Sequence, residues 1–92
     1  MTDTPPLPEV FQQVLDAATL ASLLRDLQEL ASVYEVRQRR GRDAPPLALD
    51  QVAATLTQGV GVQIKYVHDG QHWWDTLMPG PDGVTLVRIE QK

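Results

Sequence analysis

The sequence contains no cysteine. Disulfide bonds, thiolate metal sites and cysteine nucleophiles are therefore excluded. A secreted domain of this length usually needs such cross-links, so their absence favours a reducing compartment, and we expect a cytoplasmic protein. Long apolar runs and a basic, apolar leader are also missing, so the sequence predicts neither a membrane span nor a signal peptide.

Aromatic residues are scarce, at 5%, and 8 Lys and Arg face 12 Asp and Glu, which gives a net charge of −4. An acidic balance argues against a protein whose whole surface binds nucleic acid. The sequence also lacks a glycine-rich phosphate loop, a His-Glu zinc helix and a Ser-x-Gly nucleophile elbow. We therefore expect no enzymatic activity and no cofactor, and no motif identifies a reaction or a ligand.

What is present fits one globular domain. The chain has 92 residues, with apolar and charged fractions of 42% and 22%, which are ordinary for a soluble fold. Residues 1–8 hold three of the seven prolines and predict a flexible leader. Residues 9–92 are expected to form a single α+β domain.

Helical periodicity appears in the first half of the chain. Apolar residues one and four positions apart predict a helix over about 9–18. A longer leucine stripe, continued by Ala31 and Tyr34, predicts a second helix over about 20–40. Asp50 is a suitable N-cap for a short helix over 50–58.

The second half changes to a period of two, which is typical of strands. Strands are predicted over about 60–67, 72–78 and 84–90. They are separated by Asp69-Gly70, a strong hairpin signal, and by a Pro- and Gly-rich turn over 79–83. The expected fold is thus α+β, with the N-terminal helices packed on a three-stranded antiparallel meander.

Two registers are possible at the first hairpin. A two-residue turn pairs Ile64 with Asp75, whereas a three-residue bulged loop pairs Ile64 with Trp74 and turns Asp75 outward. An unpaired carboxylate among apolar residues would cost several kcal/mol. We therefore favour the bulged loop, which places Trp74 in the core and Trp73 on the second face of the sheet.

In either register, both faces of the sheet carry apolar residues. One thin layer of helices cannot cover all of them. The remainder is expected to contact another molecule. The predicted partner-binding residues are Lys65, Trp73, Trp74, Leu77, Val87 and Ile89. This pattern favours a non-catalytic protein–protein interaction module, either a homodimer or an accessory subunit of a larger assembly.

Two local clusters support alternatives. Arg37, Arg39, Arg40 and Arg42 form a basic patch, which is either a solvated helix end that favours the helix dipole or a set of phosphate contacts in a nucleic-acid-binding module. Against the second interpretation stand the acidic net charge and a short helix without Lys or Arg. His68 and His72 flank the hairpin turn and suggest a weaker alternative, a small metal-binding protein.

Overall fold

A five-stranded antiparallel sheet with both α-helices behind it forms the described part of this computed structural model, residues 10–40 and 44–91. The elements in chain order are β1 (Val10–Leu15), α1 (Ala17–Leu30), β2 (Ser32–Gln38), the 3-10 turn η1 (Leu49–Gln51), α2 (Val52–Thr57), β3 (Val62–His68), β4 (Gln71–Gly80) and β5 (Gly83–Gln91). The predicted leader, residues 1–8, lies outside the described residues.

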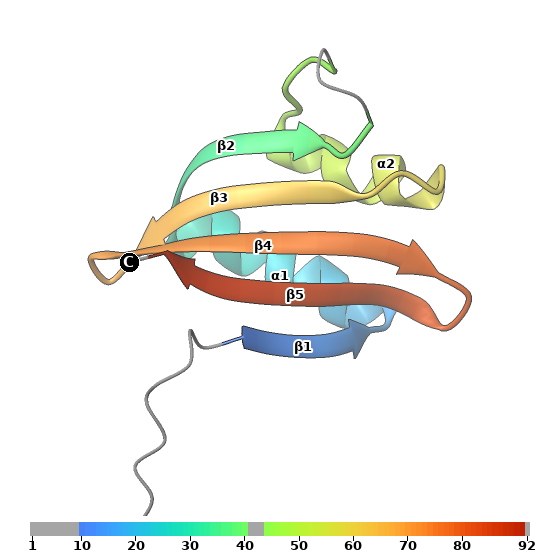
Figure 1. The fold of residues 1–92 in the computed structure, drawn as a ribbon, viewed down its shortest axis with the longest axis horizontal. Helices are drawn as coiled ribbons and strands as arrows, with labels where there is room; N and C mark the ends of the chain where they lie inside the picture. The colour runs from blue at the N-terminus through green and yellow to red at the C-terminus, as the bar shows by residue number, and fades with distance from the viewer. Residues whose placement is uncertain (1–9, 41–43, 92) are drawn as a thin grey trace, which may run out of the picture.

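The strand order is β1-β5-β4-β3-β2, and every neighbouring pair is antiparallel. Helix α1 connects the two edge strands, so it crosses behind the central strands, and α2 lies behind the sheet beside it (Figure 1). One face of the sheet is therefore covered by helices, and the other faces the viewer in Figure 1. None of the helices in the described ranges has the length and apolarity needed to span a membrane.

The helix predicted over 9–18 is wrong, because residues 10–15 form β1. The apolar spacing of this stretch fits an edge strand as well as a helix, and the pairing partner decides between them. β1 pairs with β5 along its whole length, from Val10↔Ile89 to Leu15↔Val84, and Val and Phe favour strands. Asp16 then caps α1, and its carboxylate accepts a 2.7 Å hydrogen bond from the backbone N–H of Thr19.

Only the first half of the helix predicted over 20–40 is helical, and α1 begins three residues earlier than expected, at Ala17. It ends at Leu30, Ala31 is already extended, and Ser32–Gln38 forms β2. The β-branched and aromatic residues of this stretch favour a strand, and the free edge of β3 supplies the pairing. The predicted three-stranded meander is correct for β3, β4 and β5, but β1 and β2 extend it to five strands.

The favoured bulged hairpin is also wrong. Asp69 and Gly70 have φ angles of 53° and 76°, the pattern of a two-residue turn with both residues left-handed. Ile64 therefore pairs with Asp75 and Val62 with Leu77. The second turn is equally tight, with Gly80 opposite Gly83. The one-residue slip exchanges the faces of β4 relative to the expectation.

The core lies between the helices and the covered face. It consists of Leu15, Leu20, Leu27, Val36, Val52, Leu56, Val62, Ile64, Tyr66, Leu77 and Leu86. Of the predicted leucine stripe, Leu20 and Leu27 of α1 are in the core and Leu23 and Leu24 pack against it, whereas Leu30 is exposed. The turn η1 and helix α2 occupy the predicted short helix of residues 50–58. Each fully buried aliphatic side chain contributes about 1.5–3 kcal/mol, so these residues anchor both helices to the sheet.

Candidate interaction surface

The open face is the side of the sheet that α1 and α2 leave uncovered. Strand pairing places on it Gln12 and Val14 from β1, Glu35 and Arg37 from β2, Gln63, Lys65 and Val67 from β3, His72, Trp74, Thr76 and Met78 from β4, and Thr85, Val87 and Ile89 from β5. Side chains on neighbouring strands lie directly opposite one another, so these residues form one continuous surface.

The structure separates the six residues predicted to bind a partner. Lys65, Trp74, Val87 and Ile89 share the open face. Leu77 is completely buried under the helices, and Trp73 packs against the core on the covered face. The exchange follows from the tight hairpin, because Trp73 and Leu77 alternate with the open-face residues of β4.

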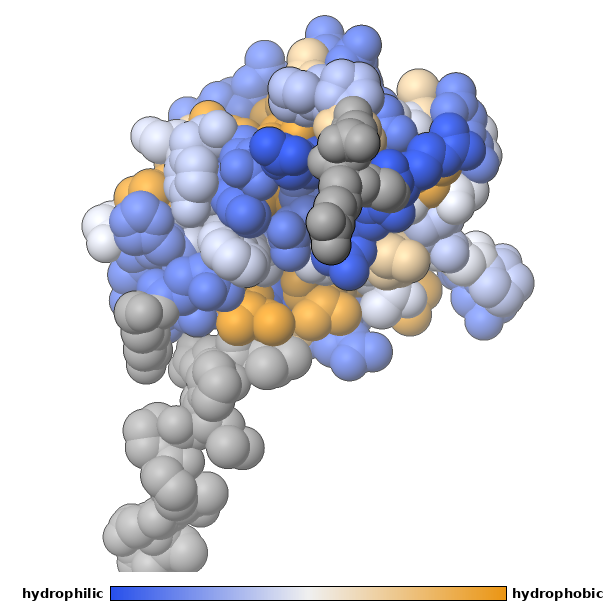
Figure 2. Space-filling view, turned by 45° about the horizontal axis from the view of Figure 1, so that its top comes forward, coloured by the Kyte–Doolittle hydropathy of each residue, from blue (hydrophilic) through white to orange (hydrophobic). Residues whose placement is uncertain are grey.

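The apolar part of the open face lies toward β1. Trp74 is directly opposite Ile89, and Val87 is opposite Thr76. The side chains of Val14 and Met78, at the same end of the sheet, are 54% and 44% exposed. Figure 2 shows hydrophobic side chains gathered on this side of the molecule, whereas hydrophilic side chains dominate toward the β2 side. Sequence reasoning missed Val14 because its strand was interpreted as a helix.

A polar row continues this surface across β3 and β2. The Lys65 ammonium lies 4.2 Å from the centre of the Trp74 ring, a cation–π contact. Lys65 also lies 3.1 Å from the Glu35 carboxylate, which Arg37 approaches at 3.2 Å. Both cations of this row thus share the single carboxylate of Glu35, and Lys65 covers one side of the tryptophan ring.

A buried ion pair on the covered face explains the register. The Asp75 carboxylate is fully buried and accepts two hydrogen bonds of 2.8 Å from the Arg88 guanidinium. The Tyr66 hydroxyl donates to the same carboxylate at 3.1–3.2 Å. Asp75 is directly opposite Arg88 on β5, so the penalty that argued against a buried Asp75 is offset by its partners.

The environment of this pair changes the acidity of its neighbours. Burial, and then the negative charge of Asp75, raises the pKa of Tyr66 well above its ordinary 10.0. The hydrogen bond to Asp75 raises the pKa of Arg88 as well. Tyr66 therefore stays protonated and Arg88 charged at neutral pH. The alternation of Arg88 with apolar residues of β5 was the available sequence signal for this pair.

The two histidines lie on opposite faces of the hairpin. His68 is on the covered side, where its Nδ1 is 3.1 Å from the Leu30 carbonyl oxygen. His72, opposite Val67, is on the open face. Its ring and the Tyr34 ring are arranged edge to face, with their centres 6.0 Å apart. Across the described ranges, no three His, Cys, Asp or Glu side chains gather closely enough to hold a metal ion.

The predicted basic patch does not end a helix. Arg37 lies within β2, Arg39 and Arg40 directly follow it, and Arg42 lies outside the described residues. Arg37 pairs with Glu35, and the Arg39 backbone N–H donates to the Gly61 carbonyl. The interpretation of the patch as complementing a helix dipole is therefore wrong.

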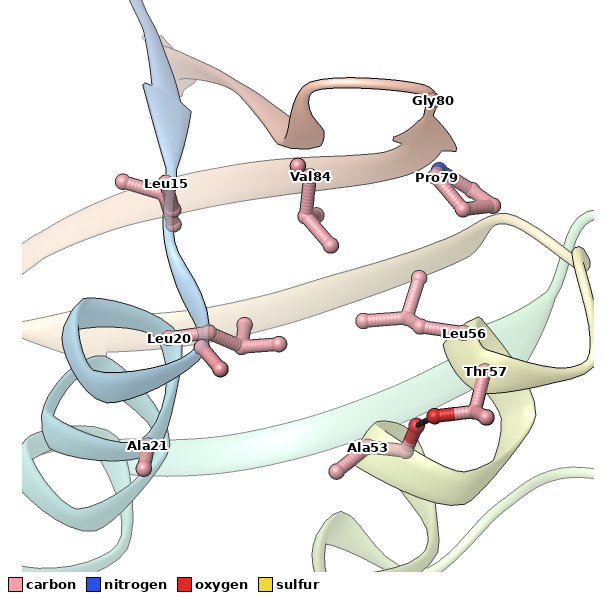
Figure 3. Close-up of a pocket in the computed structure, with 11 residues that line it drawn as sticks. Leu15, Leu20, Ala21, Ala53, Leu56, Thr57, Pro79, Gly80 and Val84 are labelled. Carbon is pink, nitrogen blue, oxygen red and sulfur yellow. Dashed lines mark hydrogen bonds between the residues drawn. The ribbon is translucent and has the colours of Figure 1, made fainter.

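An apolar cavity of about 340 Å³ separates the ends of α1 and α2. Figure 3 shows Leu20 and Ala21 on one side, Ala53 and Leu56 on the other, and Pro79 and Val84 along the sheet. Thr57 also lines the cavity, and its hydroxyl donates to the Ala53 carbonyl at 3.0 Å. None of the described residues that line the cavity is titratable.

No family model, curated protein or solved structure matches the chain.

Proposed function

We propose that the protein is a non-catalytic interaction module, and that its open face packs against the open face of a second copy. One observation carries the proposal: a five-stranded sheet has helices on one side and a continuous surface containing Trp74, Val87 and Ile89 on the other. A contiguous apolar patch of this kind marks a contact site. Two sheets packed face to face form a sandwich, which is a common way to cover such faces.

The pairing of charges within the chain supports an identical partner. Glu35 is shared by Arg37 and Lys65, so these three side chains leave only one net positive charge at the margin of a contact. In a symmetric contact, apolar residues near β1 and β5 would occupy the centre and the paired charges the margin. This matches the usual division of an interface into an apolar core and a polar rim.

A non-catalytic role fits the chemistry of the buried groups. The carboxylate of Asp75 is fully buried and already bound by Arg88 and Tyr66, so a substrate cannot reach it. The described residues that line the cavity between the helices carry no titratable group. The open face is the surface through which we expect the protein to bind its partner.

Sedimentation of the wild type and of Ile89→Lys tests this proposal. We expect the wild type to self-associate at micromolar concentration. Placing two lysines across a symmetric apolar contact should weaken association by at least about tenfold, or about 1.4 kcal/mol. Leu30→Lys is the matched control, because Leu30 is 66% exposed at the end of α1, away from the open face. Equal association of all three proteins would refute the open-face contact.

A further inference from the structure

The two edges of the sheet differ in their protection. The outer edge of β2 is paired by the segment at Pro46, which forms a bridge with Arg37. The Leu47 N–H donates to the Val36 carbonyl at 2.9 Å. β2 also carries two charges and a register irregularity between Val33 and Glu35. Charges, irregularities and covering segments are the devices that keep an edge strand from pairing with another chain.

β1 has none of these devices among the described residues. Its sequence, Val-Phe-Gln-Gln-Val-Leu, contains no charge and no proline. Its inner edge pairs with β5, and no described strand pairs with its outer edge. Phe11 and Val14 are 48% and 54% exposed, and they lie on opposite faces of the strand. An uncharged edge with exposed apolar side chains is a template for strand addition.

A hollow lies beside this edge. A cavity of about 250 Å³ opens between β1, α1 and β5, and its lining includes Phe11, Gln13, Leu23 and Arg88. The exposed phenyl ring and the space next to it thus belong to the same edge. An isologous contact needs this arrangement, because a two-fold axis makes each copy offer the same protrusion and the same recess.

We infer that β1 pairs antiparallel with β1 of a second copy, so that two five-stranded sheets join into one ten-stranded sheet. A two-fold axis perpendicular to the sheet keeps the helices of both copies on the same side. With Gln13 on this axis, Phe11 of one copy lies opposite Leu15 of the other on the covered face. Because β1 is uncharged, the identical strands meet without like-charge repulsion.

This edge contact goes beyond the proposed function, because it uses the backbone of β1 rather than the open face. The two contacts are compatible. Edge-joined pairs that stack through their open faces form a closed tetramer of two packed ten-stranded sheets.

Sedimentation of the full chain and of charged edge variants tests the inference. The double variant Phe11→Lys, Gln13→Lys places four lysines around the two-fold axis, two from each copy. Both positions lie on the covered face, so the open face is unchanged, and the variant should halve the assembly mass. The matched control is Ser32→Lys, Gln38→Lys on the protected edge strand β2, which should leave the mass unchanged. Circular dichroism confirms that each variant is folded, and the single variant Gln13→Lys repeats the test with one substitution.

Comparison with the open-face variant Ile89→Lys separates the two proposals. A wild-type tetramer halved by either variant supports both contacts. A dimer dissociated by the edge variant but not by Ile89→Lys supports the edge and refutes the open face. A dimer dissociated by Ile89→Lys alone overturns the edge inference and leaves the proposed function standing. A wild type that stays monomeric at hundreds of micromolar overturns both.

Discussion

Arg88 clamps the buried carboxylate of Asp75 through two parallel 2.8 Å hydrogen bonds, directly across the β4–β5 pair. A buried charge whose partner is removed is strongly destabilising, because nothing replaces the lost solvation. We expect Arg88→Met to lower the free energy of unfolding by about 3–5 kcal/mol, measured by urea denaturation. The double variant Asp75→Leu, Arg88→Met should cost less than Arg88→Met alone, since it removes both charges. A loss below about 1 kcal/mol for Arg88→Met would contradict this role.

The same network predicts a loss of stability at high pH. The pKa of Tyr66 is raised in the folded state, chiefly by burial, whereas in the unfolded state the phenol titrates near its ordinary 10.0. The contribution of the protonated phenol is therefore complete below pH 10 and is lost as pH rises toward the folded-state pKa. The free energy of unfolding should be measured between about pH 9 and 11, roughly one unit either side of the ordinary phenol pKa. It should fall more steeply with pH for the wild type than for Tyr66→Phe. Tyr34→Phe, at a half-exposed tyrosine, should keep the wild-type slope.

The adjacent tryptophans should respond differently to truncation. Trp73 packs against the core, so Trp73→Ala should cost about 3 kcal/mol, the lower end for buried aromatics because the ring is partly exposed. Trp74 contacts Lys65 on the open face, so Trp74→Ala should cost clearly less in folding and should weaken self-association. Urea unfolding combined with sedimentation measures both effects. A larger folding loss for Trp74→Ala would reverse the assignment of the two faces.

Gly83 is required where β5 begins beside β1. Its φ angle is 136°, and a Cβ built there would lie 2.5 Å from the Leu15 carbonyl oxygen. That oxygen belongs to the backbone of the paired strand and cannot rotate away, so Gly83→Ala should push β1 from the sheet. We expect a loss of about 2 kcal/mol or more and faster amide hydrogen exchange in β1. Gly70→Ala is a comparison at another left-handed glycine, where nothing lies within 4 Å, and its exchange effect should stay local to the hairpin.

Period and turn chemistry predicted the elements whose partners are near in sequence. The strands of β3, β4 and β5, the leucine stripe of α1 and the short helix before Val60 were all predicted. β1 and β2 were missed because their strand character depends on distant partners. β1 ends at Leu15, and its partner β5 begins only at Gly83, so no local pattern records that pairing.

The register error has a similar cause. The sequence shows the cost of burying Asp75, but the compensating Arg88 lies on another strand, and its position depends on the second turn. That second turn is also one residue shorter than expected. The shift at the first turn and the shift at the second turn therefore cancel, and the side chains of β5 keep their expected faces. Val87 and Ile89 consequently lie on the face predicted for them, whereas every β4 side chain is exchanged. The exchange of β4 brings Trp74 to the same face as Lys65, Val87 and Ile89.

Fluorescence of Trp74 during dilution tests whether the open face is covered by a second copy. In Trp73→Phe the emission reports on Trp74 alone. From about 500 µM down to about 10 nM, a range that brackets micromolar dissociation constants, the emission should shift to the red as the ring becomes hydrated. In the double variant Trp73→Phe, Ile89→Lys, the emission should already be shifted to the red at the highest concentration. Emission that stays constant across the whole range in Trp73→Phe, together with a monomeric mass, would contradict the open-face contact.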